Sequence, residues 1–171
     1  MITTANNLAG YIFRKYRDDY DMKWFGTFRQ LKLQKALYFC FAYWGGYVRQ
    51  SNTTKYDEVL FNDKIELWAT GPVIPSVFYK DNYDEFENDK ISSDPFIKSF
   101  LDLIIKDVFE TNDFKLVDIA MSDKCCKNKN WSGLLKKGKK ISKNKIIKEY
   151  SEKINYNKAV EKRLKNDKSK L

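Results

Sequence analysis

One stretch of the chain, residues 27–79, constrains the fold more than any other. Its first part predicts a helix that starts at Thr27, because Thr27 and Gln30 have the spacing of a capping box. Apolar side chains fill the second half of this helix, at Leu33, Leu37, Phe39, Cys40, Phe41, Ala42, Tyr43 and Trp44. They extend beyond a single helix face, so we expect a central helix that is buried on several sides. The pair Gly45–Gly46 predicts its end, because glycine takes the left-handed conformation at little cost.

The second part of the stretch predicts a small sheet. Two short apolar runs, 60–61 and 65–68, flank a polar turn, which is a weak signal for a hairpin. We expect two or three antiparallel strands at most. Pro72 and Pro75 each fix one φ angle and lack an N–H donor, so residues 71–75 are predicted to form a turn that ends any strand.

Capping residues and apolar spacing predict four further helices. The first is expected at about residues 4–16 with Thr3 or Thr4 as its cap, and the second at about residues 95–109, opened by Asp94–Pro95. The third is expected at about residues 113–121 with Asn112 or Asp113 as its cap, and the fourth at about residues 142–155, opened by Ser142. The third of these is expected to have an apolar side formed by Phe114, Val117 and Met121. The predicted fold is mostly α, of the α+β class: a compact helical domain at residues 1–155 around a central buried helix, with a small antiparallel β element. A basic and partly disordered C-terminal extension is expected at residues 156–171.

Charge is unevenly distributed along the 171 residues, whose formal net charge is +9. Residues 124–171 contain 17 Lys and Arg against 4 Asp and Glu, a net of +13, so the remainder carries −4. Four lysines are therefore candidates for binding phosphate groups of nucleic acid or nucleoprotein: Lys136, Lys137, Lys139 and Lys140. The alternative is a lysine-rich surface without a specific role, since no helix-turn-helix, zinc finger or RNA-recognition motif accompanies them.

The residues on which catalysis most often depends are scarce. The chain has no histidine, which excludes Ser-His-Asp and Cys-His nucleophiles and histidine metal sites. It has no glycine-rich phosphate loop, and Cys40, Cys125 and Cys126 have the spacing of neither a zinc site nor a disulfide framework. We therefore predict a protein that is not an enzyme and uses no metal or cofactor. Unpaired cysteines, no visible signal peptide and no bilayer-length apolar run predict a cytoplasmic protein without membrane insertion.

Two segments resemble the signatures of the Panacea domain, the SocA-like antitoxin family of bacteria and their mobile elements. Residues 27–39 (TFRQLKLQKALYF) are similar to the helix that opens this domain, and residues 60–68 (LFNDKIELW) followed by 71–75 (GPVIP) resemble its second signature. Trp131 and residues 142–150 are similar to its C-terminal end, so the resemblance covers roughly residues 5–150. It implies a mostly helical, non-enzymatic antitoxin that binds and neutralises a cognate protein toxin, directly or by delivering it to a protease.

Two groups of residues near the predicted central helix and sheet are candidate contacts for such a partner. The first group shares one face of the helix at three- and four-residue steps: Lys32, Lys35 and Tyr38. Its alternative is an ordinary polar helix face. The second group forms either a partner-facing ridge or a structural turn: Trp68, Gly71 and Pro72. The structural turn is favoured, because buried Trp and constrained Gly-Pro pairs usually serve packing.

A third candidate contact lies at the acidic run of residues 81–94. Tyr79 precedes this run and is expected to be exposed, and Asp84 and Glu85 within the run are candidate contacts for a basic partner. The alternative is a solvated loop. The uneven charge also supports an alternative function, a phage or mobile-element inhibitor of a host defence nuclease. Such an anti-CRISPR-like protein would bind a protein–nucleic-acid complex.

Overall fold

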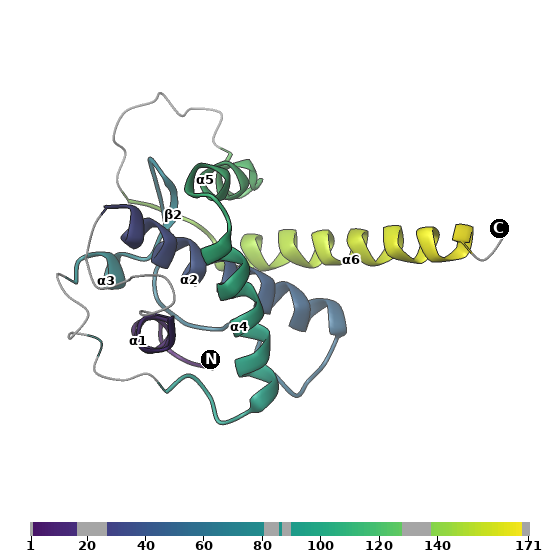
Figure 1. Ribbon diagram of the computed structural model, residues 1–171, viewed down its shortest axis with the longest axis horizontal. Helices are drawn as coiled ribbons and strands as arrows, with labels where there is room; N and C mark the ends of the chain where they lie inside the picture. Colours follow the sequence, from purple (N-terminus) through teal and green to yellow (C-terminus); the bar gives the residue numbers. More distant parts are fainter. Residues whose placement is uncertain (1, 17–26, 81–85, 87–89, 128–137, 169–171) are drawn as a thin grey trace.

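A computed structural model describes residues 2–16, 27–80, 86, 90–127 and 138–168, with side chains for all of these except 27–30 and 156–168. The described chain forms six helices and a small three-stranded antiparallel sheet around a central helix (Figure 1), which confirms the predicted fold class. In chain order the elements are α1 (Ala5–Tyr16), α2 (Thr27–Ser51), β1 (Glu66–Trp68), β2 (Gly71–Val73), α3 (Pro75–Phe78), α4 (Pro95–Glu110), α5 (Asp113–Ser122), β3 (Lys139–Lys140) and α6 (Lys143–Lys168).

Helix α2 is the centre of the core. It packs against helices α1, α3, α4, α5 and α6 and against strand β2. Leu33, Leu37, Phe41 and Trp44 on α2 are fully buried, so the expectation of a helix buried on several sides is confirmed. Helix α6 crosses α2 and then projects away from the body (Figure 1), and it passes the expected boundary at residue 155 without a break.

The prediction that Gly45–Gly46 ends the central helix is wrong, because α2 continues to Ser51. A Cβ on Gly46 would lie 2.8 Å from the backbone carbon of Tyr150, and a Cβ on Gly45 would lie 2.5 Å from Cγ1 of Ile147. Both of these residues belong to α6, so the two glycines allow α2 and α6 to approach closely. Residues 47–51 therefore belong to α2.

The predicted caps of α4 and α5 are present. The Asp94 carboxylate accepts from the N–H of Phe96 (2.8 Å), and the Asn112 side chain accepts from the N–H of Phe114 (3.0 Å). The expected apolar side of α5 is wrong at Phe114, whose relative exposure is 74%, because α5 turns Leu116 and Ala120 toward the core instead.

The sheet has the predicted size but a different hairpin. Its strand order is β2-β1-β3, and β1 and β2 pair antiparallel with Leu67 opposite Pro72. The turn of this hairpin is therefore at residues 69–70, and residues 60–61 are not a strand. Residues 71–73 are strand β2 and not part of a turn, because β2 is an edge strand, where proline is tolerated. Gly71 has φ +97°, a conformation that favours glycine.

Candidate functional site

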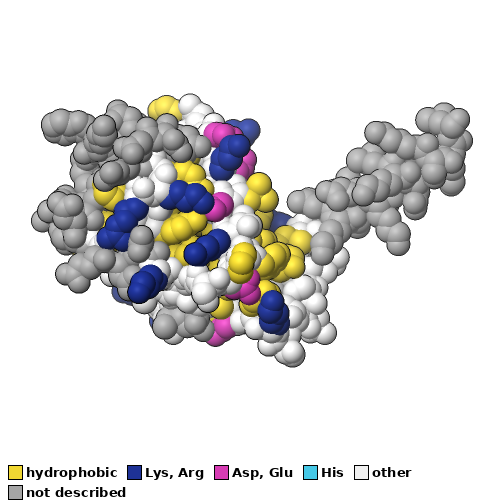
Figure 2. Space-filling view, turned by 60° about the horizontal axis from the view of Figure 1, so that its bottom comes forward, with side chains coloured by type: hydrophobic (Ala, Val, Ile, Leu, Met, Phe, Trp, Pro, Cys, Tyr) yellow, Lys and Arg dark blue, Asp and Glu magenta, His cyan; other side chains and the backbone are white. Residues whose placement is uncertain are grey.

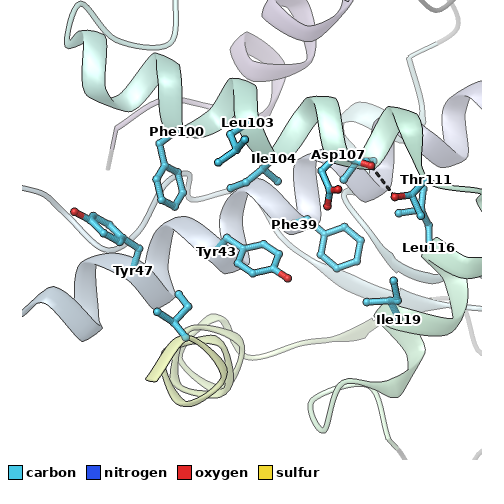
Figure 3. A pocket seen from close by; sticks show the side chains of 12 residues that line it. Phe39, Tyr43, Tyr47, Phe100, Leu103, Ile104, Asp107, Thr111, Leu116 and Ile119 are labelled. Carbon is cyan, nitrogen blue, oxygen red and sulfur yellow. Dashed lines mark hydrogen bonds between the residues drawn. The ribbon is translucent and has the colours of Figure 1, made fainter. Parts of the chain in front are cut away.

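An apolar groove lies between α2 and α4, closed by α5 at one end and bordered by α6 (Figure 3). Its volume is about 480 Å³. Twelve residues line it: Phe39, Tyr43, Tyr47, Phe100, Leu103, Ile104, Asp107, Val108, Thr111, Leu116, Ile119 and Ile154. Figure 2 shows hydrophobic side chains at the surface beside the place where α6 leaves the body, with charged side chains around them. We call this hollow the α2–α4 groove.

Regular helical spacing produces the two long sides of the α2–α4 groove. On α2, Phe39, Tyr43 and Tyr47 follow one another at four-residue steps. On α4, the lining positions from Phe100 to Thr111 repeat at steps of three and four residues. The labelled side chains in Figure 3 show that α2 and α4 run side by side in opposite directions, so the two stripes face one open channel.

Exposure separates the floor of the groove from its rim. Phe39, Val108 and Leu116 are buried and form the floor, whereas Leu103 has a relative exposure of 71%. Tyr43 and Ile119 are also exposed hydrophobic residues. An exposed apolar patch of this kind, surrounded by charged side chains, is typical of an interaction site.

Aromatic contacts hold the wall of the groove near Tyr47. The Tyr47 ring lies 5.2 Å from the ring of Phe100 and 5.7 Å from that of Phe96, and Trp44 lies 5.5 Å from Phe100. Tyr43 meets Tyr150 of α6 edge-on at 4.8 Å. These contacts pre-order the groove, which lowers the entropy lost when a ligand binds.

The polar groups of the groove are few. The Asp107 carboxylate and the hydroxyls of Tyr43 and Tyr47 line it, and none of the three has a hydrogen-bond or ion-pair partner among the described residues. Burial raises the pKa of Tyr43, so its phenol is neutral at physiological pH. The Thr111 hydroxyl donates to the backbone carbonyl of Asp107 (2.7 Å) and is thus already satisfied. Asp107 is therefore the one formally charged side chain among the lining residues.

A buried polar network behind the groove fixes α6 to the body. Asp123, which is fully buried, accepts hydrogen bonds from the hydroxyls of Tyr38 (2.5 Å) and Tyr150 (2.9 Å) and from the Lys153 ammonium. Glu149 of α6 accepts from the N–H groups of Lys124 (2.8 Å) and Cys125 (3.1 Å). The network therefore joins α2, α6 and the segment after α5, and it holds Ile154 at the border of the groove.

The predicted face of α2 points into the protein. Lys32 donates to the carbonyls of Phe109 (2.6 Å) and Thr111 (2.7 Å) at the end of α4. Lys35 is fully buried and donates to the carbonyl of Pro72 (3.1 Å), and burial lowers its pKa to about 8. Tyr38 belongs to the Asp123 network, so these three side chains support the fold and do not form a surface in this structure.

The second predicted group lies where α2 holds the hairpin. Gly71 and Pro72 are buried, and the buried Trp68 side chain donates to Glu66 (3.0 Å) and packs edge-on against Phe78 at 4.6 Å. Tyr79 is exposed as expected, with a relative exposure of 63%, and its ring lies 5.9 Å from that of Trp68.

The remaining predicted residues divide between exposed and undescribed positions. Lys139 and Lys140 form β3 and are exposed. Asp84, Glu85, Lys136 and Lys137 lie outside the described residues, and so do Trp131 and the side chains of Thr27 and Gln30.

Sequence analysis missed the α2–α4 groove, although a signal for it was present. The apolar residues of α4 are too many for one core-facing stripe: Ile97, Leu101, Ile105 and Val108 face the core, and Phe100, Leu103 and Ile104 line the groove. The other half of the signal, the spacing from Phe39 to Tyr47, was interrupted by the expected helix end at Gly45–Gly46.

Comparison of the chain with models of protein families, with curated proteins and with solved structures gives no match. Within the part of the chain that the structure describes, no helix is both long and apolar enough to cross a membrane. The same described residues contain no group of three or more His, Cys, Asp or Glu side chains that could hold a metal ion. Function is therefore inferred from the α2–α4 groove and the surfaces around it.

Proposed function

We propose that this protein is a non-enzymatic antitoxin that binds a cognate protein toxin in the cytoplasm and neutralises it through the α2–α4 groove. The observation that carries the proposal is the groove itself: a pre-ordered apolar channel of about 480 Å³, open to solvent, on a well-packed body. Apolar and aromatic side chains that lie exposed in a concave site are the usual anchors of protein interfaces. The resemblance of residues 27–39, 60–68 and 71–75 to the SocA-like antitoxins supports the same function.

The chemistry of the lining favours binding over catalysis. General acid–base or nucleophilic catalysis needs two or more reactive groups within hydrogen-bond reach of one another. The lining of the groove offers one carboxylate, Asp107, and phenols such as that of Tyr43, whose raised pKa keeps it protonated and so unable to accept a proton at neutral pH.

Co-expression in a bacterial host tests the proposed function. The open reading frame next to this gene is expressed alone and then together with this protein. We expect growth arrest by the neighbour and recovery with this protein. If direct binding is enough, the toxin stays at its full level during recovery, whereas delivery to a protease makes the toxin disappear. A neighbour whose toxicity this protein does not relieve contradicts the proposal.

A matched pair of variants tests the role of the groove in that assay. Leu103 and Phe114 are both exposed helical side chains, with relative exposures of 71% and 74%, but only Leu103 lines the groove. Leu103→Gln should abolish the recovery of growth, and Phe114→Gln should leave it intact. Recovery with Leu103→Gln, at equal protein levels, would show that the toxin is bound elsewhere.

The second candidate function is an inhibitor of a nucleoprotein, and the exposed lysines favour it. Lys124, Lys145 and Lys148 line a hollow of about 290 Å³, and Lys139 and Lys140 are exposed at the strand that leads into α6. The affinity for a DNA or RNA duplex is measured at salt concentrations from about 50 to about 200 mM. Replacing Lys139, Lys140, Lys145 and Lys148 with Gln should reduce the slope of log affinity against log salt by about 3–4. Binding that does not depend on salt would contradict this candidate.

A further inference from the structure

We propose that the α2–α4 groove accepts one amphipathic α-helix of the partner, about three turns long, with a single Lys or Arg opposite Asp107. This inference rests on the proposed function, because it takes the groove as the surface that meets the partner. It adds the conformation, the length and the charge of the segment that the groove recognises.

The shape of the groove favours a helix. Its long sides are the stripes of two helices that lie side by side, with residues at four-residue steps on α2 and at three- and four-residue steps on α4 (Figure 3). A third helix fits between two such stripes by ridges-into-grooves packing. Helix-in-groove recognition then places partner side chains at steps of three, four and seven residues against the floor formed by Phe39 and Val108.

The polarity of the groove excludes an extended segment more strongly than shape does. An extended peptide presents backbone N–H and C=O groups that each need a partner once they are buried. The lining offers the Asp107 carboxylate and the hydroxyls of Tyr43 and Tyr47 as unpaired polar groups, fewer than an extended backbone of this length requires. A helix satisfies its own backbone groups internally, so it can be buried in this lining at little polar cost.

The length of the groove sets the length of the segment. The lining residues on α4 and its C-cap run from Phe100 to Thr111, eleven residues apart, which corresponds to about 16 Å along the helix axis. A partner helix that covers this distance needs about three turns. Helix α6 limits the channel on one side at Ile154, and α5 limits it at Leu116 and Ile119.

Charge determines the last feature of the segment. Asp107 is exposed in the free protein, and covering the groove with an entirely apolar helix would remove water from this carboxylate without giving it a partner, which is unfavourable. A Lys or Arg of the partner helix opposite Asp107 would pair with that carboxylate. The α6 extension of the same chain does not cover the groove, because it continues away from the body (Figure 1).

The experiment is a selection with the full-length protein against a displayed library of 18-residue helical sequences. Enriched sequences should carry one Lys or Arg with apolar residues three and four positions away. Selection against Asp107→Lys should enrich Asp or Glu at that position instead. Fluorescence polarisation with an enriched peptide should show affinity at least about tenfold lower for Asp107→Asn. Glu110→Gln removes a negative charge one turn further along α4, outside the groove, and should change affinity less than about twofold.

Several results would overturn the inference. Enriched peptides without a basic residue would show that Asp107 does not select the ligand. Peptides that bind Leu103→Gln as tightly as wild type would show that they do not bind in the groove. Enrichment of proline-rich, extended sequences from an unbiased library would exclude a helix. A concentration-dependent dimer that disappears on truncation after residue 155 would make a second copy of the chain the occupant. The co-expression assay separates the two proposals. If growth recovers but the selection enriches no peptides with the expected basic residue, the antitoxin function stands and the helix inference fails. If such peptides are enriched but no neighbouring toxin is neutralised, the groove binds a basic amphipathic helix and the antitoxin function fails.

Discussion

Replacing Gly46 with alanine tests whether the close crossing of α2 and α6 is the reason that this position inside a helix is glycine. In an isolated helix, Gly→Ala stabilises by about 1 kcal/mol, because alanine loses less backbone entropy on folding. Here the new Cβ would lie 2.8 Å from two atoms of Tyr150 and 2.9 Å from the backbone N of Ser151. Two of these three atoms are backbone, so no side-chain rotation relieves the contacts and α6 must move.

Overpacking of this kind typically costs about 1–3 kcal/mol, and contacts with backbone atoms place Gly46→Ala at the upper end of that range. After subtraction of the gain in helix propensity, we expect a net loss of about 2 kcal/mol in the free energy of unfolding. For a chain of this size, that loss lowers Tm by about 4–8 °C. Because α6 also borders the groove through Ile154, ligand affinity should fall along with stability.

The assay is urea unfolding followed by tryptophan fluorescence, supported by calorimetry. Ser99→Gly, at an exposed position inside α4, measures part of the propensity difference in the same protein and should cost about 0.5 kcal/mol, because serine already has a lower helix propensity than alanine. If Gly46→Ala proves more stable than wild type by about 1 kcal/mol, propensity alone governs this position. The close approach of α6 would then be refuted.

Three further predictions concern buried titratable groups. Asp123→Ala leaves two buried phenols and an ammonium without their acceptor and should lower the unfolding free energy by about 3–5 kcal/mol; a loss below about 1 kcal/mol contradicts the network. Burial lowers the pKa of Lys35 to about 8 in the folded protein. Above that pH the unfolded chain therefore binds more protons than the folded chain, so the free energy of unfolding of the wild type should rise by about 2 kcal/mol between about pH 8 and about pH 9.5. Lys35→Met should lack that rise, and equal slopes in the two proteins would argue against a buried charged amine. Iodoacetamide at pH 7.5 should modify Cys125 before Cys40 in mass spectra, because a hydrogen bond with the neighbouring thiol lowers the pKa of Cys125, whereas complete burial raises that of Cys40. Labelling of Cys40 first would contradict the burial of α2.

Local sequence chemistry predicted the starts of α4 and α5 well. Asp94 and Asn112 cap α4 and α5 through hydrogen bonds to N–H groups two residues away, so the whole interaction lies within one turn of chain. The central position of α2 was predictable for a similar reason: a helix with apolar side chains around most of its circumference has to be covered on several sides.

The roles of Lys35 and Tyr38 were not predictable in this way. Both have the spacing of a polar helix face, yet Lys35 donates to Pro72 and Tyr38 donates to Asp123, residues that lie 37 and 85 positions further along the chain. Periodicity indicates which residues share a helix face, but only distant segments determine whether that face meets water or a buried acceptor.

By itself, the sequence determined the approximate positions of the five longer helices, the caps of α4 and α5, the small size of the sheet and the burial of α2, because hydrogen bonds and apolar spacing within one segment set these features. Tertiary structure alone decided that Gly45 and Gly46 lie inside a helix, since their explanation is a contact with α6, a hundred residues away. It also decided that α4 has a second apolar face left open, which produces the groove. Both outcomes depend on which helices come together, and that depends on the packing of the whole chain.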